Sequence, residues 1–170
     1  LATASGLHPF LRLLYTNFGV RHCPRCGSAL AVLSDDEIIE RMVDLAQQGP
    51  ITVAAPLVRR ATGSHATLLK LLSNEFGDAT LRVDGQPGRP HALDPAAPHS
   101  IEVDVDRLAG LITATRARQA LDQVSALSAD ALIVRRWPSG ETRISARAPV
   151  CATCGAWIGE LRPLHFHQGC

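Results

Sequence analysis

Lysine and aromatic residues are both scarce in this sequence. Lys70 is the only lysine among 17 basic residues, and phenylalanine, tryptophan and tyrosine together make up 4% of the chain. Because the aromatic residues are not interleaved with the arginines, the sequence argues against a platform that stacks single-stranded nucleic acid. A net charge of +1 supplies no overall field for nucleic acid or an anionic membrane. Any such contact must come from a local patch.

Several patterns that carry chemistry are also missing. No apolar run approaches the roughly 18–20 residues of a membrane span, and the chain begins with no charged-then-apolar leader. There is no G-x-x-x-x-G-K-[ST], H-E-x-x-H or G-x-S-x-G motif, and Lys70 stands in "TLLKLL" without glycines. The alternating acids of "EVDVD" are typical of a solvated strand face. We therefore expect a segment of a longer protein, with no secretion signal and no catalytic activity of its own.

Four of the five cysteines form two C-x-x-C pairs, each followed directly by glycine: "CPRCG" at Cys23 and Cys26, and "CATCG" at Cys151 and Cys154. This shape is typical of a zinc knuckle, in which two thiolates bind one metal ion from a tight turn. A thioredoxin-like redox pair would need a helix after the motif, for which glycine is a poor first residue. Such pairs in a chain without a leader favour a reducing compartment, the cytoplasm, over a disulfide framework.

The ligands of the metal site can be assigned in two ways. In the first, one Zn²⁺ joins both knuckles in a closed, tetrahedral, structural site with four thiolates: Cys23, Cys26, Cys151 and Cys154. In the second, which only the family resemblance given below implies, Cys151 and Cys154 share their metal with Cys170 and a residue beyond it. His165 and His167 in "LHFHQGC" could add a ligand, although such histidines are more often ordinary surface residues. We predict the first set.

Periodicity predicts alternating strands and helices between the knuckles. "DDEIIERMVDLA" places apolar residues at helical spacing, with Ser34 as the N-cap and Glu37 completing a capping box. "SIEVDVD" alternates strictly between apolar and acidic residues, and "GQPGRPHALDPAAP" before it predicts an irregular loop. The expected elements are helices at 35–46, 65–76 (capped near Ser64) and 115–127, strands at 51–58, 79–84 and 100–106, and a hairpin of 131–137 with 141–147.

The order of these elements from residue 51 to the first hairpin strand is β-α-β-β-α-β. This order is that of a ferredoxin-like sandwich, an α+β fold with a small antiparallel sheet and helices on one face. An α+β domain of another topology is the alternative. We expect three parts: a zinc-bearing base of residues 1–30 and 149–170, a connecting helix within 31–49, and a partner-interaction domain of 50–148.

A series of strings spans almost the whole chain in a fixed order: "FLRLLYTNFGVRHCPRCG", "AAPLVRRATGSHATLLKLL", "LRVDG", "HSIEVDVDRL" and "CATCGAWIGELRP". The series resembles the UvrA family, the A subunits of the bacterial nucleotide excision repair excinuclease. In that family this segment is an insertion in the first of two ABC-type ATPase modules, and it includes the domain that docks the B subunit, UvrB. The resemblance implies a longer, homodimeric parent protein that carries the ATPase and meets the DNA.

For this segment, the resemblance implies a non-catalytic, zinc-containing module that docks UvrB. Arginine suits such a docking face, because its guanidinium pairs bidentately with carboxylates and stays charged when partly desolvated. An independent zinc-ribbon domain that binds nucleic acid through its arginines is the alternative, and a redox enzyme using Cys23 and Cys26 is a third option. Four residues are predicted to share the partner-binding edge: Arg59, Arg60, His65 and Arg82.

Overall fold

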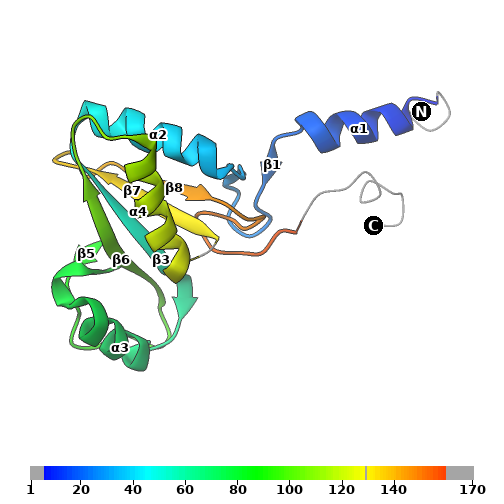
Figure 1. The fold of residues 1–170 in the computed structure, drawn as a ribbon. Coiled ribbons are helices and arrows are strands. Elements are labelled where there is room, and N and C mark those ends of the chain that lie inside the picture. The colour runs from blue at the N-terminus through cyan, green and yellow to red at the C-terminus, as the bar shows by residue number, and fades with distance from the viewer. Residues whose placement is uncertain (1–5, 129, 160–170) are drawn as a thin grey trace.

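The computed structural model describes residues 6–128 and 130–159, and an antiparallel sheet forms the centre of its main body (Figure 1). The elements are, in chain order, α1 (His8–Phe18), β1 (Arg21–His22), β2 (Ala29–Leu30), α2 (Asp35–Gln48), β3 (Ile51–Thr62), α3 (Ala66–Phe76), a 3-10 turn (Asp78–Thr80), β4 (Leu81–Val83), β5 (Gln86–Pro87), β6 (Pro98–Leu108), α4 (Ala114–Leu127), β7 (Ala131–Arg136) and β8 (Thr142–Ala146). The central sheet has six strands in the order β5-β4-β6-β3-β7-β8, while β1 and β2 form a separate pair in the base.

The strand order of the central sheet is ferredoxin-like. β3, β4, β6 and β7 are the first to fourth strands of a βαββαβ unit whose helices are α3 and α4. In the sheet these four strands lie in the order β7-β3-β6-β4, which is the 4-1-3-2 order of a ferredoxin-like fold, and every neighbouring pair is antiparallel. β5 and β8 extend the two edges of the sheet. The predicted α+β class and small antiparallel sheet are thus confirmed.

Helices α2, α3 and α4 cover one face of this sheet (Figure 1). Alternate residues of each strand point to that face, because side chains in a strand have a period of two. Met42 of α2 and Leu121 of α4 are fully buried and pack with Ile51 and Val53 of β3. α3 covers the other end of the sheet, where Leu69 and its neighbours pack on β4 and β6. One face of the sheet therefore carries the core, and α2 contributes to it.

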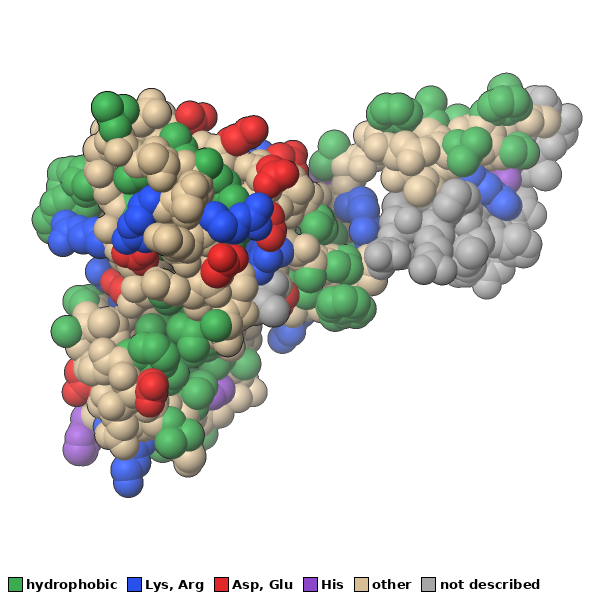
Figure 2. Space-filling view, viewed as in Figure 1, with side chains coloured by type: hydrophobic (Ala, Val, Ile, Leu, Met, Phe, Trp, Pro, Cys, Tyr) green, Lys and Arg blue, Asp and Glu red, His purple; other side chains and the backbone are tan. Residues whose placement is uncertain are grey.

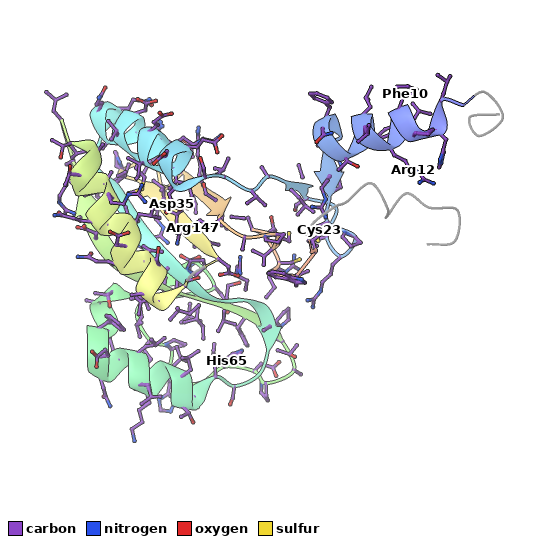
Figure 3. All side chains as sticks on the ribbon, turned by 45° about the vertical axis from the view of Figure 1, so that its right-hand side comes forward. Phe10, Arg12, Cys23, Asp35, His65 and Arg147 are labelled. Atoms are coloured by element: carbon purple, nitrogen blue, oxygen red, sulfur yellow. The ribbon has the colours of Figure 1, made fainter. Side chains whose placement is uncertain are left out.

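Helix α2 begins where the sequence predicts. The Ser34 hydroxyl accepts a hydrogen bond from the Glu37 N–H and the Glu37 carboxylate accepts one from the Ser34 N–H, so the capping box is confirmed. Asp35 then forms a two-pronged ion pair with Arg147, which follows β8 (Figure 3). Hydrogen bonds from Arg147, with a contribution from Arg118, lower the pKa of the Asp35 carboxyl. The start of α2 is thereby fixed beside the end of β8.

Helix α1 extends from the base, away from the central sheet (Figures 1 and 2). None of its residues is buried, and its apolar side chains face outward, with Phe10 70% and Phe18 81% exposed. No helix in the described ranges is long and apolar enough to cross a membrane. Because short helices gain most of their stability from packing, α1 offers an apolar surface for contact.

Some element boundaries differ from the prediction. The cap position of α3 is His65, not Ser64; its backbone is left-handed with φ +46°, and no side chain caps the helix. Only the residue directly before the helix can act as the N-cap, and its backbone must be extended for its side chain to reach the first helical N–H groups. Ser64 lies one residue too early, and His65 has a left-handed backbone. The strand expected at 79–84 is shorter, because 78–80 form the 3-10 turn. β3 and β6 are longer than expected because they pair with each other along most of their length.

The opposite face of the sheet carries ion pairs, and no helix of the described residues covers them. Arg135 donates to Glu102 at 2.5 Å and to Asp104 at 2.8 Å, and Arg82 donates to Asp104 at 3.3 Å. Burial raises the pKa of the Glu102 carboxyl, although Arg135 opposes the shift. The acids of β6 point outward as predicted, but the expectation of a freely solvated face was wrong, because the cross-strand arginines partly bury them.

Candidate metal centre and basic hollow

The first knuckle is a tight turn between the paired strands β1 and β2. The Cys23 N–H donates to the Ser28 carbonyl at 2.8 Å, and the Gly27 N–H donates to the Cys23 carbonyl at 2.8 Å. Gly27 has φ +73°, in the left-handed region that side chains disfavour, which explains the glycine after the motif. The turn brings the side chains of Cys23 and Cys26 to the same end of the strand pair.

The second knuckle repeats these contacts. The Cys151 N–H donates to the Ala156 carbonyl at 2.8 Å, the Gly155 N–H donates to the Cys151 carbonyl at 2.9 Å, and Gly155 has φ +71°. An antiparallel bridge between Val150 and Trp157 corresponds to the strand pair of the first knuckle. In the described residues neither knuckle continues into a helix, the feature that a thioredoxin-like redox pair would have. Equal spacing in the sequence thus produces equal local structure.

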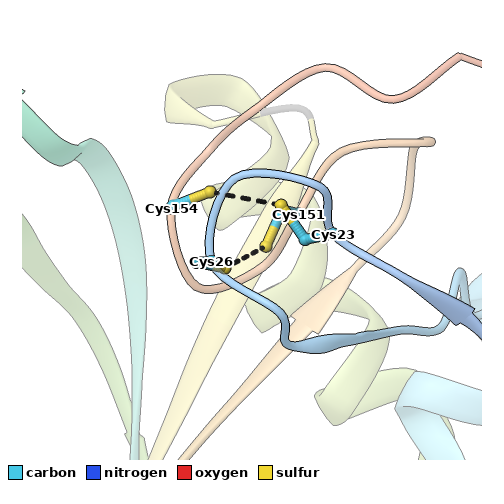
Figure 4. A group of neighbouring side chains, drawn as sticks. All are labelled: Cys23, Cys26, Cys151 and Cys154. Carbon is cyan, nitrogen blue, oxygen red and sulfur yellow. Dashed lines mark hydrogen bonds between the residues drawn. The ribbon is translucent and has the colours of Figure 1, made fainter.

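The two knuckles face each other, so that their four sulfur atoms form one cluster (Figure 4). The sulfurs of Cys23 and Cys154 are 3.6 Å apart and those of Cys26 and Cys151 are 3.5 Å apart, so each short contact crosses between knuckles. All four sulfurs lie within 4.8 Å of one another, and Cys26 is the only one of the four that is not buried. The four cysteines can therefore hold a metal ion. The rival ligands His165, His167 and Cys170 lie outside the described residues.

The thiols of this cluster differ in acidity when no metal is bound. Hydrogen bonds with the side chain and backbone of Ser28 lower the pKa of Cys26 to about 6. Burial raises the pKa of Cys154 to about 11. Metal ions bind the thiolate form, so metal binding would displace the remaining thiol protons. A closed set of four sulfur donors fits a structural tetrahedral metal such as Zn²⁺.

Arg59 connects this cluster to the central sheet. Its side chain is 12% exposed, forms an ion pair with Asp130, and donates to the Cys151 carbonyl at 3.4 Å. Gly155 approaches the same side chain so closely that a Cβ there would lie 3.3 Å from the Arg59 Cβ. The Arg59 side chain therefore extends from β3 to the second knuckle.

A basic hollow of about 590 Å³ lies next to the cluster. Arg25 lines it from the first knuckle, and Arg59 and Arg60 line it from the end of β3. His65 lines it from the residue before α3 (Figure 3). Among the residues that the structure describes, no aspartate or glutamate lines this hollow. Arg60 is exposed and has φ +50°, and its backbone N–H donates to the Ser100 hydroxyl at 3.2 Å. The structure thus brings together three of the four predicted partner-binding residues.

The fourth predicted residue, Arg82, lines a different hollow of about 420 Å³ on the open face of the sheet. Its guanidinium is paired with Asp104. The same hollow contains Trp137, whose ring is 60% exposed and lies under the guanidinium of Arg107, 5.7 Å from its carbon. The predicted set therefore divides between two hollows.

Two residues of the site were missed by sequence reasoning. Asp130 is separated from Arg59 by most of the interaction domain, so no local pattern marks it as the partner of that arginine. Arg25 carried a usable signal, because it stands between the cysteines of "CPRC" and any side chain within a metal-binding turn lies beside the metal.

A family model described as the UvrA interaction domain matches residues 34–137, more than half of the chain. The chain belongs to the UvrA interaction domain family. Among curated relatives, UvrABC system protein A of Clostridium perfringens (strain 13 / Type A) is 29% identical over 172 residues, covering 98% of this chain. UvrABC system protein A of Aquifex aeolicus (strain VF5) is 31% identical over 166 residues, covering 95% of this chain. The resemblance to the UvrA family is thus confirmed.

The chain spans 18% of the length of each of these relatives. It corresponds to one region of a UvrA protein, and the family match covers α2 through β7 together with Trp137. The two knuckles lie outside the matched stretch, one on each side of it, so the cluster of four cysteines joins the segments that flank the UvrA interaction domain.

Proposed function

We propose that this chain is a non-catalytic, zinc-containing docking module of a UvrA-like protein and that it binds a UvrB-type partner at the basic hollow. The hollow carries the proposal, because Arg25, Arg60 and His65 converge there and none of its described lining residues carries a carboxylate. A partner that presents carboxylates would meet the guanidinium groups of Arg25 and Arg60 there, and charge complementarity of this kind favours fast and specific association. Membership of an interaction-domain family supports the docking role.

The proposed role of the metal centre is structural. Zn²⁺ bound to Cys23, Cys26, Cys151 and Cys154 would join chain segments that enclose the whole interaction domain. Such a link offsets the entropy cost of holding distant segments together. Residues of both knuckles also line the hollow, Arg25 from the first and Gly155 from the second. The link would therefore set the shape of the docking surface.

The remaining activities of a UvrA-like protein would lie outside this segment. We assign ATP hydrolysis, DNA contact and homodimer formation to a longer parent protein, in keeping with the 18% of the relatives' length that this chain spans. The exposed apolar side chains of α1 suit a helix that packs against further parts of that parent. Four thiolate ligands suit the reducing cytoplasm.

Calorimetry with a UvrB protein tests the docking site. We compare the unmodified chain with Arg60→Glu, Arg82→Glu and the double variant, and use Arg89→Glu in an exposed loop as the matched control. Loss of buried charge pairs would weaken binding by several kcal/mol, whereas pairs on a wet rim would contribute under about 1 kcal/mol. Because Arg60 lies in the basic hollow and Arg82 does not, Arg60→Glu should have the larger effect.

Undiminished binding by the double variant at low salt would remove both arginines from the interface. The alternative function, direct nucleic-acid binding, predicts a different pattern. In that case duplex DNA would bind the chain without UvrB, Arg60→Glu would weaken DNA binding, and the affinity would fall steeply with salt because phosphate contacts release counterions.

A further inference from the structure

The outer edge of β8 presents backbone groups that are free for pairing. The Leu33 N–H donates to the Ala146 carbonyl from outside the sheet at 2.9 Å, so the backbone groups of Ala146 face outward. Backbone groups in a strand alternate in direction, so those of Thr142 and Ile144 face outward as well. Within the described ranges, no residue forms a hydrogen bond with the backbone of Ile144. This edge therefore has donors and acceptors for another strand.

The chain itself begins to use this edge and then leaves it. Val32 forms a parallel bridge with Ala146, which is the first step of an added strand. Ser34 then caps α2, and the helix carries the chain away from the edge. One end of the edge is thus covered by the chain's own backbone, while the stretch from Thr142 to Ile144 stays open.

A groove of about 480 Å³ lies between this open stretch and α2. Leu45 and Val134 line it with apolar side chains above the buried Ile38 and Met42, and Ile144, 38% exposed, lies at its rim. Its walls are held in place because the ion pair between Asp35 and Arg147 fixes the start of α2 beside the end of β8 (Figure 3). A groove of fixed width costs a ligand less ordering free energy than a mobile one.

We propose that the groove between α2 and β8 binds an extended peptide segment of another polypeptide, which adds to the sheet as a seventh strand. Strand addition of this kind takes affinity from main-chain hydrogen bonds and specificity from alternate side chains. The peptide's backbone pairs with Thr142 and Ile144, and one of its aliphatic side chains enters the apolar groove. This surface is distinct from the basic hollow, with which it shares no lining residue.

The charges of the groove define the peptide further. Its described lining contains two arginines, Arg41 and Arg143, against one acid, Asp44. Arg143 pairs with Glu141 at 3.0 Å, but both side chains are exposed, so a ligand carboxylate can replace that contact. Arg143 is paired with Val134 of β7, a core residue, so its side chain lies on the groove's face of the sheet. The strand residue opposite Arg143 is therefore acidic, and the aliphatic residue lies two positions away on the same face.

Fluorescence anisotropy with a labelled peptide tests the proposal. The probe is a short peptide with threonine at every second position. The positions between the threonines, which face the groove, are valine except for one glutamate. The control peptide carries lysine in place of that glutamate. The unmodified chain should prefer the glutamate peptide, and Arg143→Glu should reverse the preference, with a change of about tenfold in each direction. Equal binding of both peptides by both proteins, or no binding of either, would overturn the proposal.

Two further measurements separate strand addition from other modes. Ile144→Pro removes an outward N–H and should abolish peptide binding, whereas Ile144→Val should preserve it. Should the proline variant fail to fold, hydrogen exchange on the unmodified chain decides: the Ile144 amide should exchange more slowly when the glutamate peptide is present, and an unchanged rate would contradict pairing at β8. Dimerisation through this edge without peptide, seen by light scattering and lost in Ile144→Pro, would replace the proposed peptide by a second copy of the chain.

Discussion

The guanidinium of Arg59 on β3 donates a hydrogen bond to the backbone carbonyl of Cys151 in the second knuckle, over 3.4 Å. The same guanidinium forms an ion pair with Asp130 directly before β7. One side chain thus connects β3, the residue before β7 and the candidate metal centre. These contacts explain why the side chain of Arg59, a predicted partner-binding residue, is only 12% exposed: Asp130 and the second knuckle cover most of it.

Removing the Arg59 contacts should destabilise the chain. We expect Arg59→Ala or Asp130→Ala to lower the free energy of unfolding by about 1–2 kcal/mol, less than a fully buried pair would give because Asp130 is partly exposed. Urea denaturation of both single variants and the double variant measures the coupling. Additive effects would show that the pair contributes nothing beyond its separate contacts.

Replacing one cysteine should discriminate between the two ligand assignments. If one Zn²⁺ joins both knuckles, Cys23→Ser leaves three thiolates, and zinc content measured by mass spectrometry should fall well below one ion per chain. Ser28→Ala, in the same knuckle but without a ligand, serves as the control and should keep its zinc. Full zinc content in Cys23→Ser would show that the second knuckle shares its metal with other residues.

His99 should make stability depend on pH. Its Nδ1 lies 2.7 Å from the Asp84 carboxylate and its Nε2 lies 2.8 Å from the Asp94 carbonyl, so two acceptors favour the protonated ring. The hydrogen bond with Asp84, followed by that with Asp94, raises the pKa of His99 above its ordinary value. Although burial opposes it, hydrogen bonds from His99 and the Ser100 N–H lower the pKa of Asp84.

The sign of the pH effect follows from these directions. The contribution of His99 is fully present below its unfolded pKa of about 6.5 and is lost as pH rises through its raised folded pKa. The contribution of Asp84 is present above about pH 3.9 and is lost as pH falls through its lowered folded pKa. Urea unfolding at pH values from 4 to 9 should therefore show that the free energy of unfolding falls as pH rises above about 6.5. His99→Gln should remove this dependence on pH. The same slope in both proteins would rule out His99 as its source.

Met42 should matter as much as a residue of the sheet. It is fully buried in the core shared by α2, α4 and β3, although its helix precedes the βαββαβ unit. Met42→Ala should lower the free energy of unfolding by about 2–5 kcal/mol, the usual cost of such a truncation. Glu40→Ala on the exposed side of the same helix is the matched control and should be nearly neutral. A small effect of Met42→Ala would mean that α2 is only loosely attached.

Limited proteolysis should report the division of the chain. We predict that the interaction domain resists cleavage as a unit, with early cuts between α1 and the first knuckle or in the loop between β5 and β6. Because α2 packs into the core, the resistant fragment should begin before Asp35. Fragment masses identify the ends, and cuts spread evenly through 50–148 would contradict a compact domain.

Features that depend on neighbouring residues were predictable from the sequence. The Ser34 and Glu37 capping box, the alternation of Ile101 and Val103, and the two C-x-x-C-G turns all arise from interactions within a few residues, so their residue types are sufficient. The order of strands and helices also indicated the ferredoxin-like arrangement, because few topologies accommodate that order. The sequence alone therefore determined the fold class and the local turn that brings the two cysteines of each knuckle together.

Only the tertiary structure decided which distant residues meet. Arg59 and Arg60 both line the basic hollow, yet the Arg59 guanidinium is paired with Asp130 and contacts Cys151, whereas Arg60 is exposed beside them. Arg82 lies apart from the other three predicted residues, because β4 pairs with β6 and the Arg82 guanidinium forms an ion pair with Asp104 of β6. The open edge of β8 depends on where residues 32–33 leave the sheet. These contacts depend on the register of strands far apart in the sequence, which no local pattern specifies.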